Sequence, residues 1–257
     1  MTGLMASRLP ILTFHAIDKR SSVISISPAV FQHAMARLHE GGYQTLRLVE
    51  AADYLRRGAP FPRRSFVITF DDGYQSAYEE AFPVLEGYGM SATVFLTVGK
   101  KGGAKSGGRL PCLSGRSMLS WEEIQEMQQS GIDFGAHTLT HPDLTRLSSE
   151  EVKAEVCDGK AIIEDALSAP VPSFAYPYGR YNDQVRNMVR EHVGCACSDK
   201  LGLVSQGSDL YALERVDAFY LRTDRLFNLM LTRLFPWYIW ACSVPRLVRR
   251  AFQSGAR

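Results

Sequence analysis

Two adjacent carboxylates and a closely spaced pair of histidines are the residues best suited to chemistry in this sequence. Asp71 and Asp72 follow one another directly, and His137 and His141 are two of only 6 histidines in 257 residues. Neighbouring carboxylates repel each other unless a cation, a shared proton or solvent compensates their charge. Carboxylate oxygen and neutral imidazole nitrogen are typical zinc ligands. The four residues together therefore indicate a metal site, whereas the histidines alone would more simply be surface residues.

The carboxylates stand where a buried strand is expected to end. Residues 65–70 are mostly apolar and β-prone, and Gly73 permits a tight turn into a following helix. Helical segments separate most of the other expected strands, which cover residues 9–15, 43–48, 91–98, 132–138, 173–178, 193–198 and 213–219. This alternation predicts an α/β fold with a mostly parallel sheet, most simply a barrel. In such folds the carboxyl ends of the strands carry the catalytic groups.

Three motifs, taken together and in this order, resemble the signature of the polysaccharide deacetylases. They are Thr69-Phe70-Asp71-Asp72-Gly73, His137-Thr138-Leu139-Thr140-His141 and Tyr176-Pro177-Tyr178-Gly179. The enzymes concerned are the NodB-type members of carbohydrate esterase family 4, which remove N-acetyl groups from amino sugars. The resemblance covers about residues 9–219 and implies a distorted (β/α) barrel.

The resemblance also implies one divalent metal ion, held by Asp72, His137 and His141. Zn²⁺ is the favoured ion, with Co²⁺, Ni²⁺ or Mn²⁺ as alternatives. One carboxylate and two imidazoles would leave zinc positively charged with an open position for water, whose pKa such an ion lowers. Asp71 lies beside these ligands and is the implied base that takes a proton from the attacking water.

The third motif is implied to act through its backbone. The N–H of Tyr178 would stabilise the oxyanion formed when water attacks the acetyl group. We expect further substrate contacts from Tyr74, Pro177 and Gly179. Taken alone, a Pro-Tyr-Gly segment would equally be a plain turn that closes a strand.

Two positions depart from the family pattern. Many members have an arginine two positions before the proline of the third motif, where this chain has Ala175. We hypothesise that Arg215, on the last expected strand, replaces it in orienting the base. Many members also have a C-terminal Leu-x-His that protonates the leaving amine, but no histidine follows His192.

A histidine at the other end of the chain is the candidate for that missing acid. The segment Leu12-Thr13-Phe14-His15 resembles the permuted arrangement of poly-N-acetylglucosamine deacetylases, in which the motif moves to the N-terminus. In a barrel the first strand lies beside the last ones, so the distance in sequence is no obstacle. His15 is thereby implied as the general acid, and a buried structural histidine is the alternative.

The C-terminal segment differs in composition from the rest. We expect residues 1–222 to form the catalytic domain and residues 223–257 a helical tail. Residues 226–248 are dense in Leu, Phe, Trp, Tyr and Ile, but Arg233 and Pro236 argue against a membrane-spanning helix of about 20 apolar residues. Two interpretations stay open: membrane-surface association through residues 226–250, or a helical hairpin packed on the barrel.

The overall composition limits the class of protein. A net charge of +2 and 22% charged residues are ordinary for a globular protein and give no reason to expect nucleic acid as a partner. The five scattered cysteines are typical of a reducing compartment, and none has the C-x-x-C spacing of a structural zinc site. Residues 1–10 do not resemble a signal peptide, so we expect a location in the cytoplasm or at the cytoplasmic face of the membrane. Residues 100–116, rich in Gly, Lys and Arg, are expected to form a surface loop.

These features favour a metal-dependent hydrolase that removes an N-acetyl group from an amino sugar. The expected partner is a cell-surface polysaccharide or a lipid-linked glycan precursor. The alternatives are a catalytically inactive glycan- or lipid-binding protein on the same fold, and a deacetylase or deformylase of a non-polymeric substrate. A binding protein needs no base beside a metal, so the joint presence of Asp71 with Asp72 and the histidine pair argues against the first alternative. The sequence predicts no particular oligomeric state.

Overall fold

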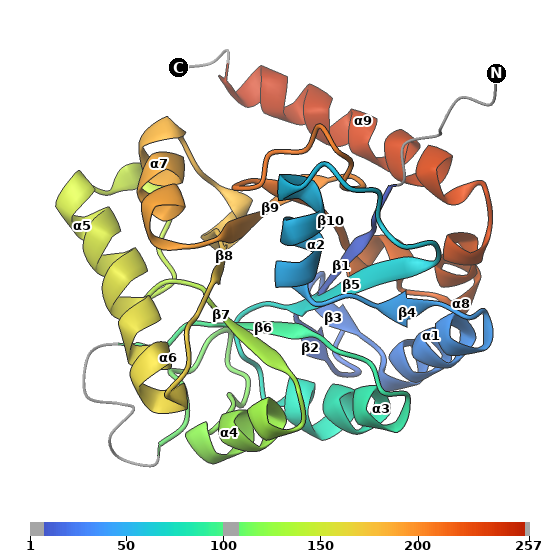
Figure 1. Ribbon diagram of the computed structural model, residues 1–257, viewed down its shortest axis with the longest axis horizontal. Coiled ribbons are helices and arrows are strands. Elements are labelled where there is room, and N and C mark those ends of the chain that lie inside the picture. Colours follow the sequence, from blue (N-terminus) through green and yellow to red (C-terminus); the bar gives the residue numbers. More distant parts are fainter. Residues whose placement is uncertain (1–7, 100–107, 255–257) are drawn as a thin grey trace.

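A closed parallel barrel of seven strands forms the centre of the computed structural model, which describes residues 8–99 and 108–254 (Figure 1). Around the ring the strands follow the order β1, β10, β9, β8, β7, β6 and β5, and β5 pairs with β1 to close it. Their bounds are β1 (Ile11–Phe14), β5 (Ser65–Phe70), β6 (Thr93–Leu96), β7 (Asp133–Ala136), β8 (Ser173–Ala175), β9 (Cys195–Leu201) and β10 (Leu213–Asp217). The expected (β/α) barrel is confirmed.

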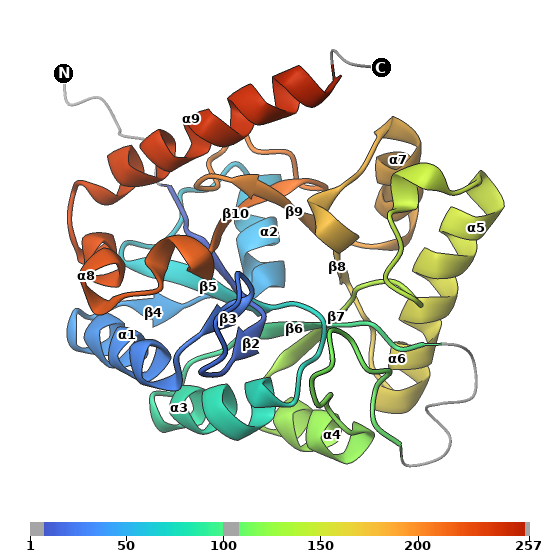
Figure 2. The same cartoon turned by 180° about the vertical axis from the view of Figure 1, so that it is seen from behind.

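Helices surround this barrel in both views (Figures 1 and 2). They are α1 (Pro28–Glu40), α2 (Leu48–Arg56), α3 (Phe82–Gly87), α4 (Trp121–Gln129), α5 (Ser149–Lys153), α6 (Gly159–Leu167), α7 (Asp183–His192), α8 (Asp224–Phe227) and α9 (Phe235–Ser254). Several begin at the caps that the sequence predicts. Ser120 with Glu123 and Ser148 with Glu151 form capping boxes, and the Asn182 side chain accepts a hydrogen bond from the third residue after it.

Three local features differ from the sequence-based expectations. The helix expected from Ser148 to Leu167 contains a π-helical turn, η4 (Ala154–Asp158), and a second one, η1 (Ala77–Ala81), precedes α3. The strand expected over 43–48 shortens to β4 (Gln44–Thr45), which pairs with β5 outside the ring, because Arg47 already caps α2. A small sheet of β2 (Ala16–Ile17) and β3 (Ser25–Ile26) follows β1 and was not predicted.

Alternation along β5 determines which side chains face the barrel interior. Val67 packs in a cluster with residues of β1, β6, β8, β9 and β10, whereas Phe66, Ile68 and Phe70 join the larger core beneath the surrounding helices. Asp71 continues the phase of Val67 and Thr69, so it points inward at the carboxyl end of the barrel. Residues of α2 join the interior cluster and cover the opposite end.

The C-terminal segment packs on the barrel through one side. Phe227 of α8, Met230 of η7 (Asn228–Leu231), and Phe235 and Ile239 of α9 belong to the same core as the outer barrel residues. α9 lies along the outside of the molecule beside β9 (Figure 1). Within residues 8–99 and 108–254, no helix combines the length and apolarity needed to cross a bilayer. Residues 100–107 of the expected surface loop and the first seven residues lie outside the described part.

Candidate active site

The residues predicted to bind metal or take part in catalysis lie together at the carboxyl end of the barrel. His15 follows β1, Asp71 and Asp72 follow β5, and the histidine pair follows β7. Together they line a cavity of about 670 Å³, to which β10 and the turn after β8 contribute further side chains. Of the predicted site residues, those that line this cavity are His15, Asp71, Asp72, Tyr74, His137, His141, Tyr178, Gly179 and Arg215. Pro177 is buried and does not line it.

Asp72, His137 and His141 form a compact triangle of potential metal ligands. Oδ1 of Asp72 lies 3.4 Å from Nε2 of His137 and 3.3 Å from Nε2 of His141, and the two Nε2 atoms are 3.2 Å apart. In a tetrahedral zinc site with bonds of about 2.0–2.1 Å, ligand atoms are about 3.3 Å from one another. The three residues therefore fit an ion of this size and geometry.

The hydrogen bonding of His137 prepares its ring for such a role. Its Nδ1 lies 2.7 Å from the carbonyl oxygen of Ala175, which can only accept a hydrogen bond. The proton must therefore sit on Nδ1, and the lone pair of Nε2 is directed at the centre of the triangle. A carbonyl that fixes the tautomer in this way is the usual outer partner of a metal-binding histidine.

Backbone strain is concentrated around this triangle. Seven non-glycine residues have positive φ in the described part of the chain, and four of them are Asp72 (75°), Thr138 (69°), His141 (62°) and Tyr178 (57°). Such conformations cost about 1–3 kcal/mol each and persist where the surroundings enforce them, often at functional sites. The strain is consistent with a loop that is held to aim its side chains.

Glu155 holds the loop between the two histidines. Its carboxylate accepts hydrogen bonds from the N–H of Leu139 at 2.9 Å, from the N–H of Thr140 at 2.8 Å and from Oγ1 of Thr140 at 2.6 Å. Glu155 lies in the π-helical turn η4, and Gly159 lets the following helix approach the loop: a Cβ there would lie 2.9 Å from the carbonyl carbon of Thr138. Sequence reasoning missed this residue, because the apolar spacing from Val152 to Leu167 is that of an uninterrupted α-helix.

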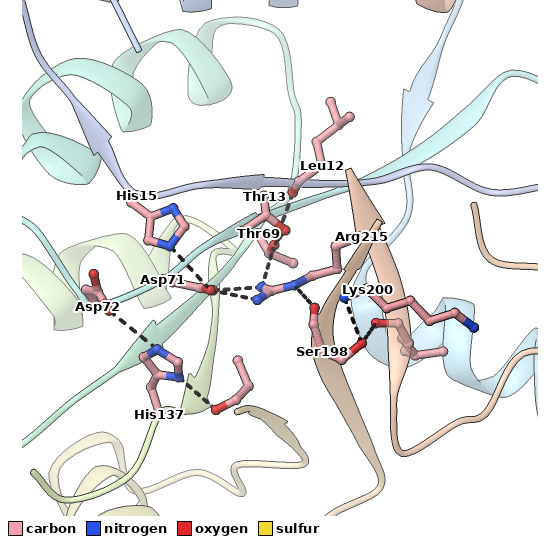
Figure 3. Close-up of polar contacts among 12 residues, drawn as sticks. Leu12, Thr13, His15, Thr69, Asp71, Asp72, His137, Ser198, Lys200 and Arg215 are labelled. Atoms are coloured by element: carbon pink, nitrogen blue, oxygen red, sulfur yellow. Dashed lines mark hydrogen bonds and ion pairs between the residues drawn. The ribbon is translucent and has the colours of Figure 1, made fainter. Parts of the chain in front are cut away.

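Asp71 is paired with Arg215 inside the barrel. The two terminal guanidinium nitrogens donate to the two carboxylate oxygens at 2.8 and 2.7 Å, and both side chains are 5% exposed. Nε of Arg215 donates to the carbonyl of Ser198 at 2.9 Å, and Nη1 lies 3.3 Å from Oγ1 of Thr69 (Figure 3). Burial alone would raise the pKa of Asp71, but the charge and hydrogen bonds of Arg215, together with the nearby His137 and His15, outweigh burial and the pKa is lowered. The carboxylate is therefore ionised and fixed in orientation, as the proposed replacement of the family arginine requires.

His15 lies on the other side of Asp71. Its Nε2 is 3.8 Å from Oδ2 of Asp71, beyond hydrogen-bonding distance but close enough for electrostatic coupling. The ring is partly exposed and borders the cavity, and it is therefore not enclosed in the core.

The third motif forms a turn at the cavity mouth. Tyr178 is 59% exposed, and its ring meets that of His141 edge-on with centroids 4.8 Å apart. Tyr74 is almost fully buried at the inner wall, where burial and the neighbouring Asp72 raise the pKa of its hydroxyl to about 12. Tyr74 is therefore a neutral hydrogen-bond donor at neutral pH.

Four other residues that line the cavity belong to none of the three sequence motifs. Asp199 of β9, Asp217 of β10, and Phe219 and Tyr220 of η6 (Ala218–Leu221) line the wall next to Arg215. Their only sequence signal is position, since they stand at or just after the ends of expected strands. Position alone selects many residues, so these four could not be singled out.

Comparison with known proteins identifies the class. The family model for polysaccharide deacetylase matches residues 58–193. YxkH of Bacillus subtilis (strain 168), which carries the same family designation, is 34% identical over 212 residues, covering 82% of this chain and 71% of the relative. The poly-beta-1,6-N-acetyl-D-glucosamine N-deacetylase of Staphylococcus aureus is 28% identical over 225 residues, covering 80% of this chain and 73% of the relative.

Solved structures agree with this assignment. The Streptococcus pyogenes deacetylase PplD, determined in complex with acetate, superposes with a TM-score of 0.78 at 25% identity, covering 88% of this chain and 99% of that one. The fold and the cavity thus define a deacetylase-type hydrolase that acts on amide bonds. The chain belongs to the polysaccharide deacetylase family.

Proposed function

We propose that this chain is a metal-dependent N-deacetylase of N-acetylated amino sugars in a glycan. The observation that carries the proposal is the ligand triangle of Asp72, His137 and His141 beside a carboxylate, Asp71, that is held ionised by Arg215. A binding protein on the same fold would have no use for this pairing. The mixed nitrogen and oxygen donors favour Zn²⁺, with Co²⁺, Ni²⁺ or Mn²⁺ as alternatives, over Ca²⁺, which takes 6–8 oxygen ligands.

The residues around the triangle have distinct roles in the proposed reaction. A divalent ion held there would supply positive charge that polarises the acetyl carbonyl and lowers the pKa of water. Asp71 takes one proton from the attacking water as the water oxygen forms a bond to the carbonyl carbon of the acetyl group. The backbone N–H of Tyr178 stabilises the negative charge on the carbonyl oxygen. His15 gives a proton to the amide nitrogen as the C–N bond breaks, so that acetate and a free amine leave.

The substrate is inferred from the relatives and from the cavity wall. The S. aureus relative is named for deacetylating poly-beta-1,6-N-acetyl-D-glucosamine. The cavity has aromatic side chains at Tyr178, Phe219 and Tyr220, which offer flat apolar surfaces to sugar rings. A polymer of N-acetylglucosamine is the first candidate, and a lipid-linked precursor is the second.

Acetate release from sugars of defined length tests this proposal. The zinc-loaded protein is incubated with β-1,6-linked N-acetylglucosamine oligomers, with the monosaccharide and with an N-acetylated lipid-linked sugar. We expect acetate from at least one glycan and much less after chelation. A protein that binds zinc and releases no acetate from any of them contradicts the proposed function.

The proposed acid predicts a dependence on the leaving group. His15→Gln should lower kcat on an N-acetyl sugar by about 100- to 10,000-fold, because an amine leaves poorly without a proton. The loss should be much smaller on 4-nitrophenyl acetate, whose leaving group needs no proton. His33→Gln is the matched control, since His33 is exposed and pairs with Asp224 away from the cavity. An equal loss on both substrates would exclude the role of acid for His15.

The loop contact of Glu155 predicts an effect on metal affinity. Glu155→Ala removes three hydrogen bonds from the loop between the histidines, and outer contacts of this kind typically change metal affinity by about 10- to 100-fold. Zinc titration against a competing chelator measures the loss. Glu155→Gln keeps one acceptor oxygen and should lose less, and Glu150→Ala, on the same helical segment, should lose nothing. Wild-type zinc affinity in Glu155→Ala would show that the loop between the histidines keeps its conformation without Glu155.

A further inference from the structure

The helix α9 is apolar on two opposite faces. Phe235 and Ile239 are buried in the core, and the hydroxyl of Tyr238 donates to the backbone carbonyl of Tyr220 at 2.6 Å. The face turned away from the barrel carries Trp237, which is 70% exposed, and Trp240, which is 62% exposed. A helix on the surface of a globular protein normally has polar side chains on its outward face.

The exposed apolar residues of this segment follow a helical spacing. Leu234, just before the helix, is 62% exposed, and Val244 continues the row beyond Trp237 and Trp240. Ala241 and Pro245 are the other exposed residues of this stretch, and no residue from 234 to 245 is charged. A continuous apolar surface with two tryptophans is unusual for a part of the molecule that meets water, so a partner of low polarity is expected to cover it.

The length of the apolar segment restricts the kind of partner. The eleven helical residues from 235 to 245 extend for about 16 Å, whereas a bilayer span needs about 20 residues. One face of the helix is, moreover, already committed to the barrel. The segment is therefore suited to lie along a bilayer surface, with tryptophan rings at the level of the headgroups.

The charge around the segment indicates the sign of that surface. Residues 225–257 contain six arginines and no aspartate, glutamate or lysine. Arg233, immediately before the apolar stretch, is exposed, and Arg246 follows it directly in sequence. Arginines at both ends of an apolar segment complement anionic headgroups.

We propose that the outward face of α9 docks on the surface of an anionic lipid bilayer. The occupant is the lipid surface rather than a second copy of the chain, because a self-complementary contact would bring the arginines of two copies together without acidic partners in this segment. The helix would lie flat and keep its contact with the barrel.

The docked helix is joined to the wall of the active-site cavity. Tyr238 of α9 is hydrogen-bonded to Tyr220, and Tyr220 lines the cavity together with Phe219. Docking would thus hold this wall close to the lipid surface. If the proposed function is correct, on which this consequence alone rests, glycans attached to or emerging from a membrane would be the preferred substrates.

Tryptophan fluorescence of the full chain tests the docking without any measurement of activity. The chain has three tryptophans, and the third, Trp121, is buried in the core. Vesicles of phosphatidylcholine with 30% phosphatidylglycerol should shift the emission to shorter wavelength, and pure phosphatidylcholine should do so much less. In Trp237→Phe/Trp240→Phe only Trp121 remains, and its emission should not change. Added salt should weaken the binding, because exposed charges are screened.

Flotation with the same vesicles completes the test. Trp237→Ser/Trp240→Ser should bind anionic vesicles at least tenfold more weakly than the wild type, with an unchanged circular dichroism spectrum. No binding of the wild type, or equal binding of the variant, would overturn the proposal. So would light scattering that shows a stable dimer abolished by the same two substitutions, because the partner would then be a second copy.

Discussion

Asp71→Asn is expected to lower turnover by about 100- to 10,000-fold while zinc remains bound. The amide has the size of the carboxylate but cannot take a proton from water. The ligands Asp72, His137 and His141 are untouched, so the metal content should equal that of the wild type. Metal analysis together with acetate release checks both parts.

Asp71→Asn is also expected to lower stability, because it changes the partner of a buried arginine. Arg215 is buried, and its guanidinium would face a neutral amide in Asp71→Asn, which costs stability. Turnover must therefore be measured well below the unfolding temperature of the variant. The control is Asp53→Asn, at an exposed aspartate that does not line the cavity, and it should leave turnover unchanged. Wild-type turnover in Asp71→Asn would remove Asp71 from the mechanism.

Arg215→Met is expected to lower the free energy of unfolding by about 3–5 kcal/mol and turnover as well. The substitution leaves the Asp71 carboxylate buried without its cation, and breaking one partner of a buried pair is costly. The carboxylate also loses the two hydrogen bonds that fix its orientation toward the cavity. Denaturant unfolding and kcat measure the two effects, and zinc content should not change.

Two further variants separate orientation from charge. Arg215→Lys keeps the positive charge but cannot donate to both oxygens in one plane, so turnover should recover only in part. In Asp71→Asn/Arg215→Met neither unpaired charge remains, so its loss of stability should be smaller than the sum of the single losses. Additive stability losses would show that the pair is not coupled, and unchanged turnover in Arg215→Met would refute its role in orienting the base.

Much of the fold was predictable because local signals and the global arrangement agree. The apolar run from Ser65 to Phe70 became β5 with the bounds read from the sequence, and the capping residues Ser120 and Ser148 begin helices as expected. The strand expected over 43–48 is present only as the two-residue β4, since Arg47 caps a helix at that point. The π-helical turn η4 was not predictable, because the buried Val152, Val156, Ile163 and Leu167 keep the spacing of a continuous α-helix.

The candidate site was predictable only where residue types form a motif. The three motifs predicted that Asp72 and the two histidines form one site. The distances of 3.2–3.4 Å between their ligand atoms could not be predicted from the spacing of these residues in the sequence. The carboxylate of Glu155 binds backbone N–H groups of the loop, and Tyr220 lines the cavity wall. Neither residue belongs to a motif that would mark it in the sequence. Arg215 was a guess from strand position. Its contact with Asp71 depends on barrel closure, which places β10 and β5 on either side of β1.

The most direct test of the central claim compares the wild type with Asp72→Ala for zinc content and for acetate release from N-acetylglucosamine oligomers. We expect about one zinc ion per wild-type chain with release of acetate, and loss of both in a folded variant. A wild type that binds no divalent ion at all, or an Asp72→Ala variant that still releases acetate at the wild-type rate, would contradict a metal-dependent deacetylase centred on Asp72.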